Sequence, residues 1–150
     1  MYIKEFDSLQ ECPRELHNKK DNPIMNGTIT IQKEWYTIAQ CKNNPDKIYV
    51  FGDNSIRLGT GGQAKIRNEP NTFGVMTKLY PSQRAGSYLE DCLDHRAMVL
   101  ADLQKLRQLY EAGADIILPA DGLGTGLAQL PVRAPKLHKM IEEFIALYTH

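Results

Sequence analysis

The segment Ile116–Leu127, IILPADGLGTGL, constrains the fold more than any other part of the sequence. It starts with three uncharged apolar residues, a pattern typical of a parallel strand that is buried on both faces. After a short turn, glycines follow at alternate positions, Gly122, Gly124 and Gly126. The segment therefore predicts a central strand that ends in a glycine-rich loop.

Such a loop has two interpretations. Successive glycines can direct several backbone N–H groups into one concavity, which binds a phosphate or diphosphate without a charged side chain. A buried strand, a glycine loop and a helix together place a phosphate at the carboxyl end of a sheet, and Pro131 and Pro135 mark where a final helix can start. The alternative is a tight strand-to-helix turn without a ligand, and the glycine pattern alone leaves both open.

A second apolar segment, Lys47–Gly52, predicts another central strand. It is followed by Asp53, Asn54 and the glycine-rich segment 55–63, SIRLGTGGQ. If the two strands are neighbours in one parallel sheet, both loops open on the same edge and can enclose one ligand. Asp53 and Asn54 then lie where they can hydrogen-bond sugar hydroxyls. The alternative is that they stabilise a turn or helix cap.

Two common phosphate-binding motifs do not fit the glycine-rich segment Gly59–Lys65. It lacks the Gly-Lys-Ser/Thr ending of a nucleoside triphosphatase loop. No G-x-G-x-x-G occurs in a strand–helix turn, as a hydride-transfer dinucleotide site would require. The nucleoside triphosphatase loop is therefore rejected, and the hydride-transfer fingerprint is a poor match.

The remaining elements complete an α/β pattern. Strands are predicted over Gly27–Trp35 and Thr72–Lys78. Lys78 is a candidate partner for an anion at a strand end, and the commoner alternative is a solvated lysine at a strand terminus. Helices are predicted over Gln63–Asn68, Tyr88–Ala112 and Ala134–Tyr148. Residues 1–25 carry no readable pattern.

Composition bounds the function. At 150 residues the chain is expected to be a single domain over 1–150. Its 18 basic and 18 acidic residues balance, which argues against stable nucleic-acid binding. No apolar run is long enough for a membrane span. Three widely spaced cysteines predict a reduced, cytoplasmic protein without a structural zinc site, and no cofactor or metal site is expected.

Two stretches, IYVFGDNSIRLGTGGQAKIR and IILPADGLGTGLAQLP, resemble the macrodomain family and its macro-like relatives. The phage- and bacteria-encoded members with a V-F-G-D-N strand end look nearest. The resemblance covers about a third of the chain. It implies a three-layer α/β/α fold with a mixed central sheet flanked by helices, and a cleft that binds ADP-ribose.

The resemblance also implies site residues. Asn54 resembles the asparagine near the distal ribose, and Gly61 and Gly62 resemble the glycines of the catalytic loop. The segment that resembles the diphosphate loop consists of Gly122, Leu123, Gly124, Thr125, Gly126 and Leu127. The expected ligand-binding set also includes Gly52, Gln63 and Lys78.

The sequence departs from the family at two places. Macrodomains commonly carry Gly-Asp-Ile-Thr near the start, and its Asp contacts the adenine. The nearest match here is Gly27–Thr30, with Thr28 in place of the Asp. The first loop reads Gly-Asp-Asn where many relatives have Asn-Ala-Ala-Asn, so Asp53 is free to hold a ribose hydroxyl or to polarise a water.

Three functions compete. In the first, the chain hydrolyses ADP-ribosyl groups on a protein or nucleic acid, with Asp53 or Asp121 positioning the water and Asn54 holding the ribose. In the second, the same pocket binds or sequesters ADP-ribose or a cyclic NAD-derived signal without chemistry. In the third, the chain is a structural or partner-binding domain whose glycine turns are merely tight. No oligomeric state is indicated.

Overall fold

A four-stranded sheet in the order β1-β4-β2-β3 forms the centre of the computed structural model, which describes residues 26–149. The strands are β1 (Thr28–Gln32), β2 (Lys47–Asn54), β3 (Thr72–Lys78) and β4 (Asp115–Pro119). The helices, with η for the 3-10 type, are α2 (Ile38–Asn43), η3 (Gly62–Ile66), η4 (Ala85–Ser87), α3 (Leu93–Glu111), α4 (Leu130–Arg133) and α5 (Pro135–Ala146). The chain is therefore an α/β domain over this range.

All pairings between these four strands are parallel. The two glycine-loop strands are neighbours, because β2 pairs with β4, so the condition for both loops to open on the same edge is met. The expected mixed sheet is wrong for the strands within residues 26–149. Helical connections, α2 after β1, η3 after β2 and α3 after β3, return the chain to the same edge before each new strand, which makes neighbouring strands parallel.

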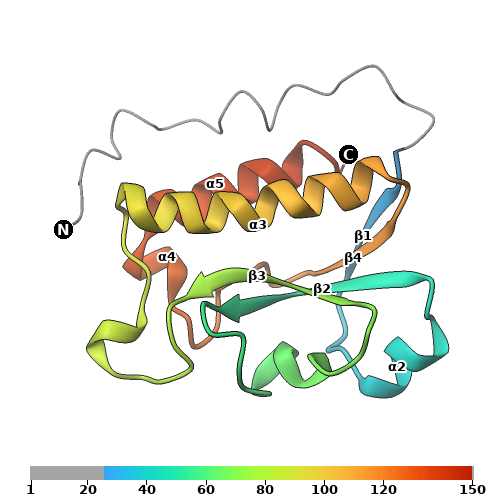
Figure 1. Cartoon of the computed structure of the whole chain (residues 1–150), viewed down its shortest axis with the longest axis horizontal. Coiled ribbons are helices and arrows are strands. Elements are labelled where there is room, and N and C mark those ends of the chain that lie inside the picture. Colours follow the sequence, from blue (N-terminus) through green and yellow to red (C-terminus); the bar gives the residue numbers. More distant parts are fainter. Residues whose placement is uncertain (1–25, 150) are drawn as a thin grey trace.

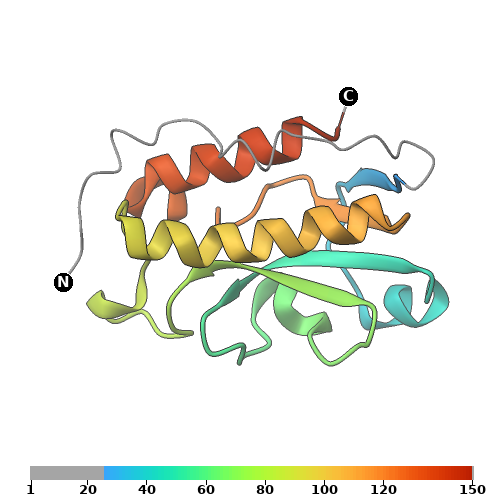
Figure 2. The same ribbon diagram turned by 45° about the horizontal axis from the view of Figure 1, so that its top comes forward.

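Both faces of the sheet are covered. The side chain of Val50 packs in the cluster that contains core residues of α3 and α5. Its neighbours Tyr49 and Phe51 point to the opposite face and pack with Cys41 of α2 and Ile66 of η3. Figures 1 and 2 show α3 and α5 side by side along one face of the sheet. The apolar runs seen in the sequence are explained by this two-sided burial.

Several boundaries differ from the sequence prediction. Strand β3 has the predicted bounds, but β2 continues through Asp53 and Asn54. Strand β1 ends at Gln32, whose side-chain amide donates to the Glu34 carbonyl oxygen in a bend. Helix α3 starts after Tyr88, since Tyr88 forms an antiparallel bridge with Lys78. These differences move three predicted loop or helix residues into or beside the sheet.

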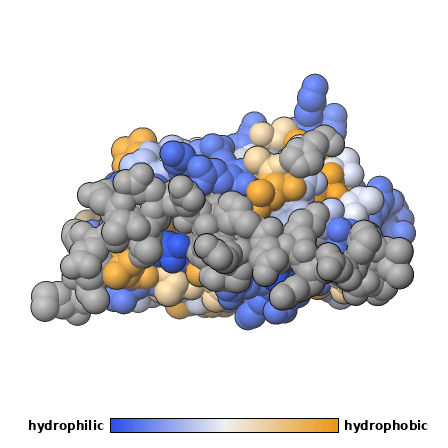
Figure 3. Space-filling model, turned by 90° about the horizontal axis from the view of Figure 1, so that it is seen from above, coloured by the Kyte–Doolittle hydropathy of each residue, from blue (hydrophilic) through white to orange (hydrophobic). Residues whose placement is uncertain are grey.

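The surface on the side of α3 and α5 is shown in Figure 3, where hydrophilic and hydrophobic residues are interspersed on the part that the grey atoms leave visible. No helix within residues 26–149 is long and apolar enough to cross a membrane. The unreadable segment 1–25 lies outside the described residues.

Candidate functional site

A pocket of about 750 Å³ opens at the carboxyl ends of the strands. The arrowheads of β2 and β3 in Figure 1 mark this edge, beside α4. The predicted site residues that line the pocket are Gly52, Asp53, Asn54, Gly61, Gly62, Gln63, Lys78, Asp121, Gly122, Gly124, Thr125, Gly126 and Leu127. The two glycine-rich loops thus converge on one cavity, as expected for adjacent parallel strands.

Leu123 is the predicted site residue that does not line this pocket. Its side chain is buried and belongs to the core cluster that also contains Leu130. The flanking Gly122 and Gly124 have positive φ values of 87° and 80°. Leu123 therefore anchors the loop in the core while its neighbours stay at the pocket.

Both the backbone conformation and the lack of space for a side chain require glycine at position 124. A Cβ at this position would lie 2.9 Å from the Cβ of Leu130 and 3.0 Å from the Cβ of Thr77. The loop also lies against β2, because a Cβ on Gly52 would be 3.4 Å from the Gly124 nitrogen. By contrast, a Cβ on Gly126 would meet no described atom within 4 Å. The close approach of loop to strand thus depends on Gly124 and Gly52.

The backbone N–H groups of Leu123–Leu127 have no hydrogen-bond acceptor within residues 26–149. The loop is closed instead by two other donors, Gly122 N to the Pro119 carbonyl and Leu130 N to the Gly124 carbonyl, at 3.1 and 2.9 Å. The N–H groups of Gly59–Gly61, in the first loop, likewise have no acceptor in the described part of the chain. Two runs of unpaired donors therefore border the same pocket.

Asp121 lies at the start of the second loop and is exposed. Its carbonyl oxygen accepts a hydrogen bond of 2.8 Å from the Thr125 hydroxyl. Its carboxylate has no hydrogen-bond or ion-pair partner among the described residues. Asp121 is therefore an accessible carboxylate at the pocket.

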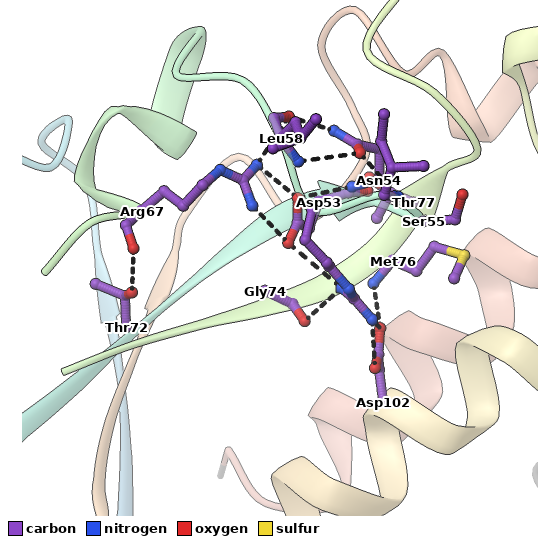
Figure 4. Close-up of polar contacts among 12 residues, drawn as sticks. Asp53, Asn54, Ser55, Leu58, Arg67, Thr72, Gly74, Met76, Thr77 and Asp102 are labelled. Carbon is purple, nitrogen blue, oxygen red and sulfur yellow. Dashed lines mark hydrogen bonds and ion pairs between the residues drawn. The ribbon is translucent and has the colours of Figure 1, made fainter. Parts of the chain in front are cut away.

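Asp53 is in the opposite situation. Its carboxylate is buried and accepts two hydrogen bonds from Arg67, of 3.0 and 2.6 Å. It also accepts one of 3.3 Å from Arg57 and one of 2.8 Å from the Asn54 backbone N–H. Figure 4 shows Asp53 at the centre of these contacts. Both carboxylate oxygens are thus already used to hold the chain together.

Arg57 extends this network to α3. Its guanidinium donates to both carboxylate oxygens of Asp102, at 2.9 and 2.8 Å, and to the Gly74 carbonyl oxygen at 3.1 Å. Asp102 is buried and also accepts from the Met76 backbone N–H at 2.8 Å. Arg57 itself has a positive φ of 57°. These charge-assisted bonds fix the start of the first loop against β3 and α3.

The side chain of Asn54 is committed to a turn. Its amide nitrogen donates to the Leu58 carbonyl oxygen at 2.7 Å, and its oxygen accepts from the Ile56 N–H at 3.2 Å. This is the turn-stabilising role that the sequence left as the alternative. Asn54 lines the pocket, but the expected ribose contact would have to compete with these bonds.

Lys78 is a buried cation at the pocket. Its side-chain ammonium lies 5.0 Å from the ring centroid of Tyr88 and has no carboxylate partner within residues 26–149. Burial lowers the pKa of Lys78. Arg133 packs on the same Tyr88 ring at 3.9 Å. Positive charge therefore gathers at this end of the pocket.

Thr28, the expected substitute for the adenine-contacting Asp, does not line the pocket. It lies at the amino end of β1, where its hydroxyl donates to Asp115 at 2.7 Å. The pocket is at the carboxyl ends of the strands, so an adenine contact in this pocket would have to come from a residue other than Thr28.

The pocket also contains residues that sequence reasoning missed. Trp35, Arg67 and Thr77 line it. Arg57 does not line it, but it joins the pocket residue Asp53 to Asp102 of α3. The only local signal for the arginines was their position within and after a glycine-rich loop, where charge usually indicates solvent exposure. No group of three or more His, Cys, Asp or Glu side chains that could hold a metal occurs in the part of the chain that the structure describes.

The comparisons with known proteins identify a family whose function is unknown. No curated protein and no solved structure matches the chain. A model for a family of unknown function, DUF7831, matches residues 31–144 and so covers both loops and the whole pocket. The chain belongs to this family of unknown function, DUF7831.

Proposed function

We propose that the pocket binds ADP-ribose or a related NAD-derived nucleotide, with the diphosphate on the loop Gly122–Leu127. One observation carries the proposal: the backbone N–H groups of Leu123–Leu127 have no acceptors in the described residues, and four of these five residues line a pocket that also contains the buried Lys78, which has no carboxylate partner in the same range. Oriented N–H groups in a glycine loop are an anion-binding arrangement. The resemblance to macrodomains selects ADP-ribose among diphosphate ligands.

Lys78 supports an anionic ligand independently. A buried ammonium without a counter-charge is unfavourable, and burial lowers its pKa accordingly. An anion bound nearby would supply the missing partner, since a charge-assisted hydrogen bond is about twice as strong as a neutral one. The cation over Tyr88 holds the side chain in place for that contact.

The sugar end of the ligand is assigned to the first loop. Gln63 lines the pocket, and its side-chain oxygen accepts from the Tyr36 N–H at 2.9 Å. Its amide nitrogen has no acceptor within residues 26–149 and can donate to a hydroxyl. Asn54, the ribose residue that the resemblance suggests, would need to exchange its turn contacts for such a bond.

Hydrolysis of an ADP-ribosyl group is the second candidate function, and the accessible carboxylate of Asp121 favours it. A general base must reach the proton of the attacking water, and an exposed carboxylate at the pocket can do so. Asp53, the other candidate, already accepts hydrogen bonds on both oxygens. We therefore assign the base to Asp121 and a scaffold role to Asp53.

Calorimetric titration of the full chain with ADP-ribose, with AMP and NAD as controls, tests the binding proposal. Micromolar affinity, about −8 kcal/mol, is expected for ADP-ribose. AMP, which lacks the diphosphate, should bind at least tenfold more weakly. Absence of both heat and thermal stabilisation with ADP-ribose at millimolar concentration would contradict the proposal.

The Asp121→Asn variant separates catalysis from binding. If Asp121 is the base, this variant should bind ADP-ribose like the wild type but lose about a hundredfold or more in turnover of ADP-ribosylated protein or DNA. Asp46→Asn, a change outside the pocket lining, is the matched control. Equal turnover by Asp121→Asn and the wild type would remove Asp121 from the mechanism, and no turnover by the wild type would favour a binding module.

A further inference from the structure

We propose that Trp35 is the surface on which the aromatic base of the ligand stacks, and that it fixes the direction in which the ligand lies. This inference rests on the proposed function and makes its ligand more specific. Trp35 lines the pocket, yet the residue is 57% exposed. An indole leaves apolar surface in water at such a position, and a stacked base would remove that surface from water.

The position of Trp35 is held by its neighbours. Tyr36 is fully buried, and its hydroxyl donates to the carbonyl oxygens of Val50 and Ile117 at 2.8 and 3.2 Å. The Tyr36 backbone N–H donates to Gln63 at 2.9 Å. The residue directly after Trp35 is thus tied to both central strands and to η3. Little additional ordering is needed when a ligand meets the indole, which favours binding.

The contacts of the ring point to the same role. A Cβ on Gly62 would lie 3.9 Å from the indole, so the absence of a side chain at this position leaves room beside the ring. The Lys65 ammonium lies over the ring at 5.8 Å from the centroid. This cation restrains the indole and adds positive charge beside the pocket.

The strand order gives the ligand a direction. Trp35 follows β1, one edge strand, and Lys78 ends β3, the other edge strand. The two glycine loops follow the central strands β4 and β2 and lie between them. An aromatic group at Trp35, a diphosphate over the central loops and an anionic or polar end towards Lys78 match this arrangement. It also provides a base site that does not involve Thr28.

Trp35 is the single tryptophan of the chain, so its fluorescence reports the contact directly. The wild-type chain is titrated with ADP-ribose and, separately, with ribose 5-phosphate, which lacks the base. Emission should be quenched by ADP-ribose and unchanged by ribose 5-phosphate. Base stacking of this kind implies that Trp35→Ala weakens ADP-ribose binding about tenfold or more.

Three controls accompany this measurement. Trp35→Phe retains an aromatic face and should stay within about threefold of the wild-type Kd for ADP-ribose. Ile38→Ala, an exposed apolar residue three positions further that does not line the pocket, should leave the Kd unchanged. Binding of inorganic pyrophosphate should be equal for the wild type and Trp35→Ala.

The outcomes distinguish this inference from the proposed function. If ADP-ribose binds the wild type and Trp35→Ala equally, without a change in emission, the stacking role is overturned and the proposed function stands. If Trp35→Ala weakens pyrophosphate binding as much as ADP-ribose binding, its effect is on the shape of the pocket and the inference also fails. If the wild type binds pyrophosphate but not ADP-ribose, the nucleotide proposal fails and the base site fails with it.

Discussion

The loops after β2 and β4 occupy equivalent positions at the same edge of the sheet, yet they are held in different ways. The first loop is fixed by side chains, through Asp53, its two arginines and Asn54. The second is fixed by backbone hydrogen bonds and by glycines with positive φ. The side chains of Asp53 and Asn54 in the first loop are thus hydrogen-bonded within the protein. In the second loop, the N–H groups of Leu123–Leu127 and the Asp121 carboxylate have no partner within residues 26–149 and can bind a ligand.

The difference shows that a polar residue at the end of a strand is not by itself a ligand contact. Asp53 is buried and pairs with Arg67, so removing its charge would leave that guanidinium without a carboxylate partner among the described residues, whereas Arg57 would keep Asp102. The backbone N–H groups of Leu123–Leu127 have no such internal use within residues 26–149. Ligand affinity is therefore expected to depend on the second loop, and stability on the network of the first.

The largest expected effect is that of Asp53→Asn on stability. It removes a carboxylate that is paired with two arginines, so the free energy of unfolding should fall by about 3 kcal/mol in urea titration. Lys42→Met, which breaks a surface ion pair with Glu69, is the control and should change stability by less than about 1 kcal/mol. A stable Asp53→Asn chain that binds ADP-ribose but cannot hydrolyse ADP-ribosyl groups would instead indicate that Asp53 is catalytic.

Gly124→Ala should come next. The added methyl group meets Leu130 and Thr77 at a backbone conformation that suits glycine, so a loss of about 2 kcal/mol in stability is expected. Displacement of the loop N–H groups by this methyl group should also weaken ADP-ribose binding at least tenfold, as measured by calorimetry. Gly126→Ala, at an open position in the same loop, should leave the stability nearly unchanged. Equal losses of stability in the two variants would contradict the assigned geometry.

Lys78→Met should weaken ADP-ribose binding about tenfold, or about 1.4 kcal/mol, with the fold retained. The pH dependence sharpens this test. Burial lowers the pKa of Lys78, so the ammonium loses its charge at a lower pH than an ordinary lysine. As the pH rises through that lowered pKa, affinity of the wild type should fall, while the profile of Lys78→Met should stay flat. Parallel profiles would exclude Lys78 as the anion partner.

Much of the fold could be predicted because its signals are local. The strands β2, β3 and β4 appear as apolar runs next to turn residues, and parallel pairing of β2 with β4 follows from their lack of polar faces. Helix α2 was missed although a local signal was present. Thr37 caps its first turn by accepting from the Gln40 N–H at 3.0 Å, and Thr-x-x-Gln is a known helix-start pattern.

The network around Asp53 could not be predicted, because its partners are distant in sequence. Asp102 is 45 residues from Arg57 and lies on a helix whose charged residues give no hint of a buried partner. The role of Leu123 was missed for a different reason. Its neighbours indicate a glycine loop, and only the positive φ values on both sides of it show why the side chain enters the core.

The account depends most directly on the N–H groups of the second loop, and NMR amide shifts on titration with ADP-ribose and with inorganic pyrophosphate measure them one by one. With both ligands, the amide signals of Gly124, Thr125 and Gly126 should show the largest shifts and saturate together with the calorimetric isotherm. Binding accompanied by shifts confined to other regions, with these three signals unmoved, would contradict the account.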